Sequence, residues 1–192
     1  MSDDASPLTL EQQLALCRIQ FSDANLQMQQ ALRCCERALL TLQAGNYGVS
    51  ALLLDAEGEC LFEAENRVFS QGFTPAAHAE MRLLDQYQAA QPTTVTPEQL
   101  TLLTLLEPCP MCFSRILLTG IGRVKYLVAD PEGGCAAHPS RLPPAWQNLS
   151  GLCSVEQVKL PDPLFQLASN IAFAHQQELR RKLLCAIRPA IL

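Results

Sequence analysis

Four residues of metal-binding and proton-carrying types stand out by their spacing. His78 lies two residues before Glu80, and Cys109 and Cys112 form a Cys-x-x-Cys element further along the chain. One imidazole and two thiolates suit Zn²⁺, and three protein ligands leave the fourth tetrahedral position open, as in catalytic zinc sites. A structural zinc site usually has a fourth Cys or His ligand. The pattern therefore predicts a catalytic zinc centre held by His78, Cys109 and Cys112.

Glu80 is expected to carry protons beside this centre and not to bind the metal. Positions two apart on a helix point to nearly opposite sides, so His78 and Glu80 can share a pocket only if a helix begins between or just before them. Zinc lowers the pKa of a bound water towards ~7. A carboxylate beside that water can take its proton and pass it to a substrate. The predicted chemistry is a hydrolysis that removes an amine from a heteroaromatic ring.

Two predicted helices must begin at the metal for this chemistry to work. One runs from about His78 to Ala89, and the other opens at Cys109, after a buried strand over Leu100–Leu106. Cysteines three apart share one face of a helix, and the unpaired N–H groups of a helix start favour thiolates. We therefore expect two helix N-termini to face each other and to hold one zinc ion between them.

The rest of the chain alternates strands and helices. A capping box at Thr9 begins a helix or helix pair that reaches about Leu42. Strands alternating with helices predict an α/β fold, a three-layer α/β/α sandwich with a central mixed sheet of about five strands. The further predicted strands form a hairpin of Val49–Leu54 and Cys60–Glu65, followed by Arg123–Ala129 and Ser154–Leu160. Loops are predicted over Asn66–Pro75 and Gln91–Thr94, a long, partly structured loop over Asp130–Leu152, and one long closing helix over Pro161–Ile187.

The composition predicts one globular domain. Of the 192 residues, 48% are hydrophobic, which is enough for a sizeable core. The expected parts are an N-terminal helical segment (1–46), a zinc-binding α/β core (47–160) and a C-terminal helix (161–192). No apolar run approaches the ~18 residues that a membrane span needs. The acidic start lacks the features of a secretory signal, so a cytoplasmic protein without membrane contact is expected.

Cysteine usage and charge narrow the possible partners. Nine cysteines are an odd number, which favours metal binding and buried thiols over a disulfide scaffold. The net charge of −5 argues against a broad nucleic-acid footprint. Basic residues gather only near the C-terminus, where a solvated helix surface explains them as well as RNA contact does. They are Arg180, Arg181, Lys182 and Arg188.

With these motifs in order, the chain resembles the cytidine-deaminase-like superfamily of zinc deaminases. The branch it resembles most contains bacterial tRNA adenosine deaminases and small guanine deaminases. The resemblance covers roughly Val49 to Asp130. It is carried by Ala64–Arg67, Ala77–Met81, Leu106–Cys112, and Ile121–Val124 through Asp130-Pro131.

The resemblance implies further site residues. Asn66 would hydrogen-bond the base at the pocket mouth, the backbone near Ala79 would contact its carbonyl or ring nitrogen, and Asp130 would lie beside the bound substrate. The residues themselves leave simpler roles open, because Asn66 is also a typical turn residue after a strand and Asp130 is also a typical turn start. Enzymes of this branch are commonly dimers with pockets near the interface, so the resemblance also implies a homodimer.

The implied function is zinc-dependent hydrolytic deamination of a small molecule, a nucleobase or nucleoside, with purines such as guanine or adenine favoured. One alternative is a tRNA wobble-position adenosine-to-inosine deaminase. Another is a catalytically silent deaminase-fold subunit that binds zinc and RNA, although retention of Glu80 argues against it.

Several positions depart from the tRNA-acting branch and put tRNA recognition in doubt. Gly48–Ala51 stand where those enzymes usually carry Pro-Val-Gly-Ala, and Phe113–Arg115 stand where they have small residues. Leu152-Cys153 replaces their Asn-His before the last strand. The acidic net charge also weakens the case for binding an anticodon loop. Closure of the pocket by the terminal helix would favour small molecules, and an open basic groove would favour RNA.

Overall fold

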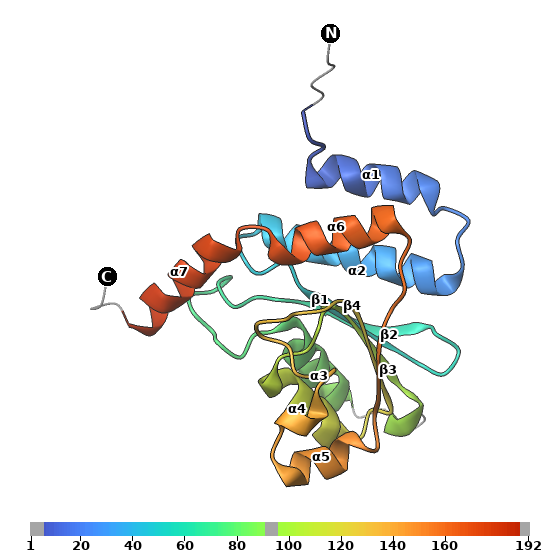
Figure 1. The fold of residues 1–192 in the computed structure, drawn as a ribbon, viewed down its shortest axis with the longest axis vertical. Helices are drawn as coiled ribbons and strands as arrows, with labels where there is room; N and C mark the ends of the chain where they lie inside the picture. Colours follow the sequence, from blue (N-terminus) through green and yellow to red (C-terminus); the bar gives the residue numbers. More distant parts are fainter. Residues whose placement is uncertain (1–5, 91–95, 189–192) are drawn as a thin grey trace.

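The structure is a computed structural model that describes residues 6–90 and 96–188. Its centre is a five-stranded mixed sheet with strand order β2-β1-β3-β4-β5 (Figure 1). β1 is antiparallel to β2 and β3, whereas β3, β4 and β5 run parallel. The strands are β1 (Ser50–Leu54), β2 (Cys60–Glu65), β3 (Thr101–Leu106), β4 (Arg123–Val128) and β5 (Ser154–Gln157).

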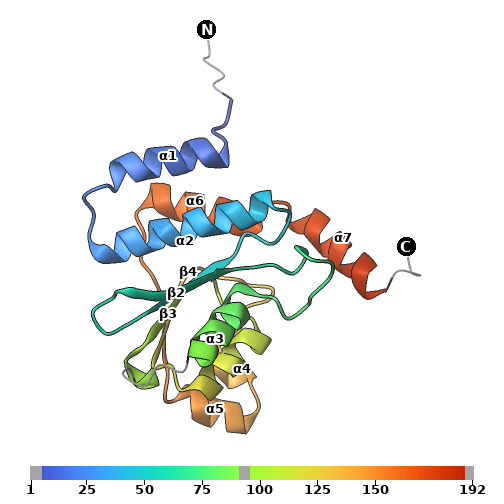
Figure 2. The ribbon, with the colours of Figure 1, turned by 180° about the vertical axis from the view of Figure 1, so that it is seen from behind.

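Helices cover both faces of this sheet, which confirms the predicted three-layer α/β/α fold. α2 and α6 lie on one face with α1 outside them, and α3, α4 and α5 lie on the other (Figures 1 and 2). The helices are α1 (Leu10–Gln20), α2 (Leu26–Gln43), α3 (Ala79–Ala90), α4 (Pro110–Thr119), α5 (Pro144–Ser150), α6 (Asp162–Phe173) and α7 (Gln176–Ile187). Short 3₁₀ turns occur at Pro97–Gln99 and Pro139–Arg141.

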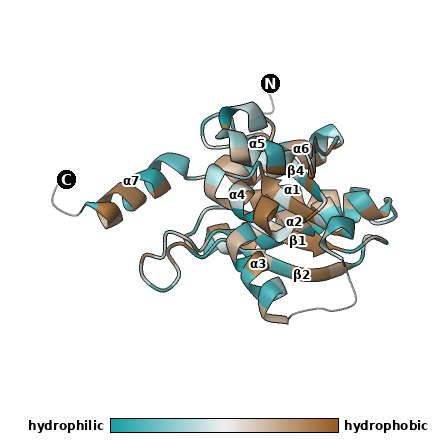
Figure 3. Cartoon of the chain, turned by 90° about the horizontal axis from the view of Figure 1, so that it is seen from below, coloured by the Kyte–Doolittle hydropathy of each residue, from teal (hydrophilic) through white to brown (hydrophobic). Residues whose placement is uncertain are grey.

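The sheet separates two hydrophobic cores. Alternate residues of one strand point to opposite faces, so Leu52 and Leu54 pack towards α2 and α6, whereas Ala51 and Leu53 pack towards α3 and α4. All five residues of β1 are buried, as are the first five of β3. This double-sided burial explains the unbroken apolar runs in the sequence. In Figure 3 the hydrophobic residues gather around the strands, and α7 extends away from them.

The N-terminal segment is a helix pair, one of the two forms predicted. The capping box is confirmed, because Thr9 accepts a hydrogen bond from the Gln12 N–H while the Gln12 side chain bonds back to the Thr9 N–H. Asn25 caps α2 by accepting from the Met28 N–H at 3.1 Å. The hairpin of β1 and β2 is also confirmed.

The prediction of one closing helix over Pro161–Ile187 is wrong. The chain forms two helices, α6 and α7, that are separated at Ala174 and His175. His175 adopts a left-handed conformation (φ 54°), which ends the helical path of α6. α6 buries an apolar face of five residues, whereas Leu179 is the one buried residue of α7. The break therefore frees the polar α7 to turn away from the sheet.

Smaller differences concern the loops. β5 ends at Gln157, before the predicted Leu160. The long loop over Asp130–Leu152 is partly structured, as predicted, because it contains a 3₁₀ turn and α5. The predicted loop at Gln91–Thr94 lies outside the described residues. Within residues 6–90 and 96–188, none of the helices combines the length and the apolar character that crossing a bilayer requires.

Gly48 occupies a position with no room for a side chain, just before β1. A Cβ atom added there would lie 2.5 Å from the Ile171 carbonyl oxygen of α6. We expect Gly48→Ala to lower the free energy of unfolding by about 1–3 kcal/mol, because the backbone of α6 must shift. Denaturant unfolding measures this. Gly151→Ala is the control, since Gly151 has ordinary helical angles and its nearest contact is 3.3 Å away; equal losses in both variants would contradict the steric argument.

Candidate metal centre and pocket

The N-termini of α3 and α4 meet at the carboxyl end of β3. His78 directly precedes α3, and Glu80 lies in its first turn. Cys109 is the N-cap of α4, with extended backbone angles (φ −70°, ψ 167°), and Cys112 follows in the first turn. The predicted helix boundary at His78 is therefore confirmed, and it lets both His78 and Glu80 reach one pocket.

The three predicted ligand side chains converge. His78 Nδ1 lies 3.7 Å from Cys109 Sγ and 3.5 Å from Cys112 Sγ, and the three ligand atoms all lie within 4.8 Å of one another. With Zn–N of about 2.0 Å and Zn–S of about 2.3 Å, a nitrogen and a sulfur on tetrahedral zinc are about 3.6 Å apart. The spacing and the donor types therefore fit zinc, with one coordination position left for another group.

The contact between Cys109 and Cys112 favours a negative charge on Cys109, which suits binding of a cation. The Cys112 thiol, followed by His78, lowers the pKa of Cys109 to about 4, so Cys109 is a thiolate at neutral pH. The same contact between the sulfurs raises the pKa of Cys112. Metal binding to such a site displaces the remaining thiol proton, because only the thiolate is a ligand.

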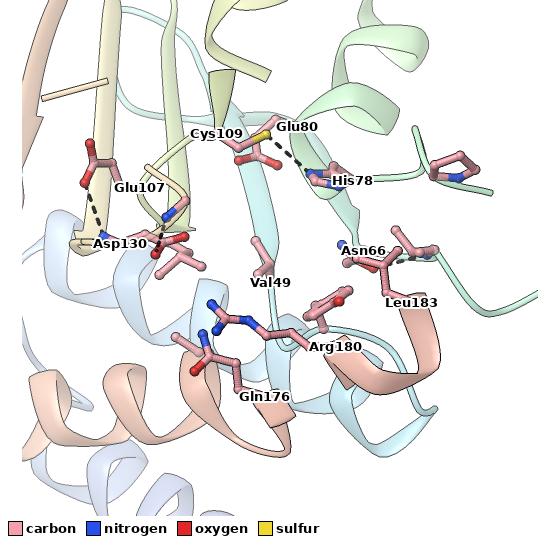
Figure 4. Close-up of a pocket in the computed structure, with 16 residues that line it drawn as sticks. Val49, Asn66, His78, Glu80, Glu107, Cys109, Asp130, Gln176, Arg180 and Leu183 are labelled. Atoms are coloured by element: carbon pink, nitrogen blue, oxygen red, sulfur yellow. Dashed lines mark hydrogen bonds between the residues drawn. The ribbon is translucent and has the colours of Figure 1, made fainter. Parts of the chain in front are cut away.

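Glu80 lies beside these ligands and is buried, with 4% of its surface exposed. Its Oε2 atom is 3.5 Å from Cys112 Sγ. Burial, followed by the nearby Cys109 sulfur, raises the pKa of the Glu80 carboxyl. In Figure 4, Glu80 sits next to Cys109 and His78 at one end of a pocket. The predicted juxtaposition of this carboxylate with the metal ligands is therefore present.

His78, Glu80 and Cys109 line one end of a cavity of about 270 Å³. This volume is near the lower limit of ligand pockets, which run from roughly 300 to 1,000 Å³. The lining combines apolar side chains such as Val49 and Leu106 with polar ones, namely Asn66, Glu107 and Asp130. Such a small, mixed cavity suits a compact ring with a few polar groups.

Asn66 is a turn residue that also lines the pocket, and its predicted hydrogen bond to a base stays a prediction. Its Oδ1 accepts a hydrogen bond from the Val68 N–H at 3.1 Å, as a turn residue after β2 would. Its side chain also lines the pocket (Figure 4). Among the described residues, its Nδ2 group has no hydrogen-bond partner, so this donor is free for a ligand.

Asp130 likewise starts a turn and lines the pocket. Its Oδ1 accepts from the N–H groups of Glu132 and Gly133 at 3.1 and 2.9 Å. Ala79 is fully buried at the first position of α3 and is not among the side chains that line the cavity. Its N–H belongs to a first helical turn, whose donors have no partner within the helix, and its contact with a substrate stays a prediction.

Glu107 is a pocket residue to which the sequence assigned no role. It is 6% exposed, and its two carboxylate oxygens accept from the N–H groups of Ala137 and Asp130 at 3.0 and 3.2 Å. This carboxylate therefore holds the turn that carries Asp130 against the end of β3. The signal available in the sequence was an acidic residue at the end of an otherwise buried strand.

Arg115 joins α3 and α4, the two helices that begin at the predicted metal ligands. From α4 it donates to the Met81 carbonyl of α3 at 2.9 Å, and to Asp85 and Gln88 at 2.7 Å each. Phe113 is fully buried in the core on the same face of the sheet. The larger residues after Cys112, which depart from the tRNA-acting branch, thus position α3 relative to α4.

α7 forms one side of the pocket with residues that the sequence analysis did not identify. Gln176, Arg180 and Leu183 line the cavity opposite the metal ligands (Figure 4). Their spacing of four and three residues places them on one helix face, and this spacing was the signal in the sequence. The terminal helix therefore closes one side of the pocket, which is the arrangement expected for small substrates.

The predicted role of His78, Cys109 and Cys112 as zinc ligands can be tested without a substrate. We expect the purified protein to contain about one zinc ion per chain, and His78→Ala or Cys112→Ser to lose most of it, because two ligands do not retain catalytic zinc well. Metal analysis after dialysis measures the content. Cys185→Ser, which changes an exposed cysteine on α7, is the control. Full zinc content in all variants would show that the ion binds elsewhere.

Comparison with known proteins agrees with this site. The profile of the family described as "Cytidine and deoxycytidylate deaminase zinc-binding region" matches residues 22–128, more than half of the chain. A tRNA-specific adenosine deaminase of Bacillus subtilis (strain 168) is 34% identical over 94 residues, which are 49% of this chain and 56% of that protein. The chain thus spans about half the length of this relative.

Two solved structures share the fold. One comes from a study of A-to-I editing by tRNA:A34 deaminases (TM-score 0.54, 22% identity, 65% of this chain and 93% of that one). The other is a guanine deaminase from Nitrosomonas europaea (TM-score 0.56, 19% identity, 74% and 82%). With its profile match over the residues that build the metal centre, this chain belongs to the cytidine and deoxycytidylate deaminase family.

Proposed function

We propose that this protein is a zinc-dependent hydrolytic deaminase that removes the exocyclic amino group of a nucleobase or nucleoside and releases ammonia. Purines such as guanine or adenine are the favoured substrates. The observation that carries this proposal is the convergence of His78, Cys109 and Cys112 beside a buried Glu80, at the end of a cavity of about 270 Å³. The family match supports the same class of reaction.

In this proposal the residues divide the work. Zinc, when bound by its three ligands, supplies a Lewis acid that makes water nucleophilic near neutral pH. Glu80 takes one proton from the attacking water and delivers it to a ring nitrogen of the substrate. It then takes the second proton from the new hydroxyl group on the attacked carbon and gives it to the departing amine, so that ammonia leaves and a carbonyl group remains. Its burial next to the ligands fixes the carboxylate and keeps bulk water from competing for the proton.

The pocket lining supports a neutral ring as substrate. Asn66 lines the cavity with an amide group that could donate to a ring, and Asp130 lines the same cavity. Three carboxyl groups line the cavity, those of Glu80, Glu107 and Asp130. The cationic Arg180 also lines the cavity, but its guanidinium is already paired with Glu132. The three carboxyl groups therefore disfavour a phosphate close to the ring, and a base or nucleoside fits better than a nucleotide.

A tRNA wobble adenosine deaminase is the second candidate. The 34% identity to the tRNA-specific adenosine deaminase of Bacillus subtilis favours it. The position of α7 along the pocket and the net charge of −5 favour a small substrate instead. The presence of Glu80 argues against a silent subunit, which has no use for a proton carrier. The homodimer implied by the resemblance stays a prediction.

Replacing Glu80 tests the proton-transfer role. We expect Glu80→Ala and Glu80→Gln to lower kcat by about 10²- to 10⁴-fold, the range typical of a lost general acid–base group, while zinc content stays unchanged. Ammonia release and metal analysis on the same samples measure both quantities. Glu57→Gln, at an exposed turn, is the control. Unchanged ammonia release from every active substrate would remove Glu80 from the mechanism.

A substrate screen separates the two candidate functions. Zinc-loaded protein is assayed for ammonia release with guanine, adenine, their nucleosides and a tRNA anticodon stem-loop. We expect turnover of at least one free base or nucleoside with a higher kcat/KM than that of the stem-loop, because α7 narrows the pocket. Inosine formation in the stem-loop alone would favour the tRNA deaminase and refute our first choice.

A further inference from the structure

α7 lines the pocket without being part of either hydrophobic core. Its pocket-facing residues are Gln176, Arg180 and Leu183, and its one buried residue is Leu179. Helices with few buried apolar contacts open locally at low free-energy cost. This wall of the pocket therefore depends on a small number of individual contacts.

Two of those contacts are hydrogen bonds, of which one is part-buried and the other is exposed. Tyr47 donates to the Leu179 carbonyl at 3.4 Å, which is a long hydrogen bond. Lys182 Nζ donates to the Gly45 carbonyl at 3.2 Å and lies 4.3 Å from the centre of the Phe69 ring. Both tethers lie on the side of α7 that meets the loops after α2 and β2. Neither reaches the opposite side of the pocket.

Arg180 makes the contact that reaches that opposite side. Its guanidinium forms an ion pair with Glu132. Glu132 belongs to the turn whose neighbouring residues Asp130 and Gly133 line the cavity. Glu107 holds this turn in place, because its carboxylate accepts a hydrogen bond from the Asp130 N–H. The ion pair therefore joins α7, which has few buried contacts, to the turn at residues 130–133, which is anchored at the end of β3.

We propose that this ion pair, the α7 clasp (Arg180 with Glu132), holds α7 across the pocket and limits the size of the substrate that enters. Arg180 is then a specificity-determining residue. The closed clasp admits a free base readily and admits a base that carries ribose or a polynucleotide less readily. The consequence for selectivity rests on the proposed deaminase function, whereas the attachment of α7 by the clasp does not.

The expected effect is modest. The two side chains are 48% and 63% exposed, and exposed ion pairs change an equilibrium by roughly two- to fivefold. Opening the clasp should therefore raise kcat/KM for a nucleoside relative to its free base by about two- to fivefold. Because salt screens exposed charges, with a Debye length of about 3 Å at 1 M, high salt should produce the same shift in the wild-type protein.

The test uses Arg180→Ala, Glu132→Ala and the charge-reversed pair R180E with E132R. Arg181→Ala is the matched control, because Arg181 is the next residue of α7, is exposed and lies outside the pocket lining. Hydrogen exchange of the zinc-loaded protein reports on α7 and on residues 130–137. We expect faster exchange in both segments for each alanine variant, wild-type exchange for Arg181→Ala, and recovery in the charge-reversed pair.

The second readout is the ratio of kcat/KM for guanosine to guanine and for adenosine to adenine. It should rise in the two alanine variants and become insensitive to salt, while Arg181→Ala keeps the wild-type ratio and its salt dependence. Hydrogen exchange equal to that of Arg181→Ala would refute the clasp. Faster exchange with an unchanged ratio would refute its role in selectivity. Wild-type protein that deaminates none of these compounds would refute the proposed function instead, and hydrogen exchange would still decide the clasp.

Discussion

The structure depends on one constraint: two helices must begin within a few ångströms of each other at the end of the same strand. α4 starts directly after β3, and α3 arrives from the hairpin of β1 and β2. Where the two first turns meet, the His78 imidazole nitrogen lies 3.7 Å from Cys109 Sγ and 3.5 Å from Cys112 Sγ. The unpaired N–H groups of both helices point to this place, and they favour negative charge on the sulfurs and on Glu80.

The surrounding fold keeps these two helix starts in position. Arg115 joins α4 to α3 through the Met81 carbonyl, and Arg82 of α3 donates to the Glu65 carbonyl at the end of β2 at 2.7 Å. Behind them, the apolar faces of α3 and α4 pack on Leu53 and Leu102 of the sheet. The site is therefore positioned by both polar contacts and core packing, as a centre with short ligand distances requires.

The side of the pocket formed by α7 is held by a different kind of interaction. The predicted metal ligands stand on elements that pack in a hydrophobic core, whereas α7 is attached by hydrogen bonds and by the ion pair of Arg180 with Glu132. Buried packing gives a fixed geometry, and exposed polar contacts give an arrangement that opens at little cost. The predicted metal ligands therefore stand on closely packed elements, whereas the side of the pocket formed by α7 depends on a few contacts at the surface.

The sequence alone determined the parts of this protein that depend on local rules. Helix starts at His78 and Cys109, the spacing of Cys109 and Cys112, the capping box at Thr9 and the doubly buried strand before Glu107 all follow from contacts within a few residues along the chain. The tertiary structure alone decided the break at His175 and the roles of Glu107 and Arg180. No glycine or proline marks that break, and the partners of Glu107 and Arg180, Ala137 and Glu132, come from distant segments. Their contacts exist only because the sheet brings the end of β3, the following turn and α7 around one cavity.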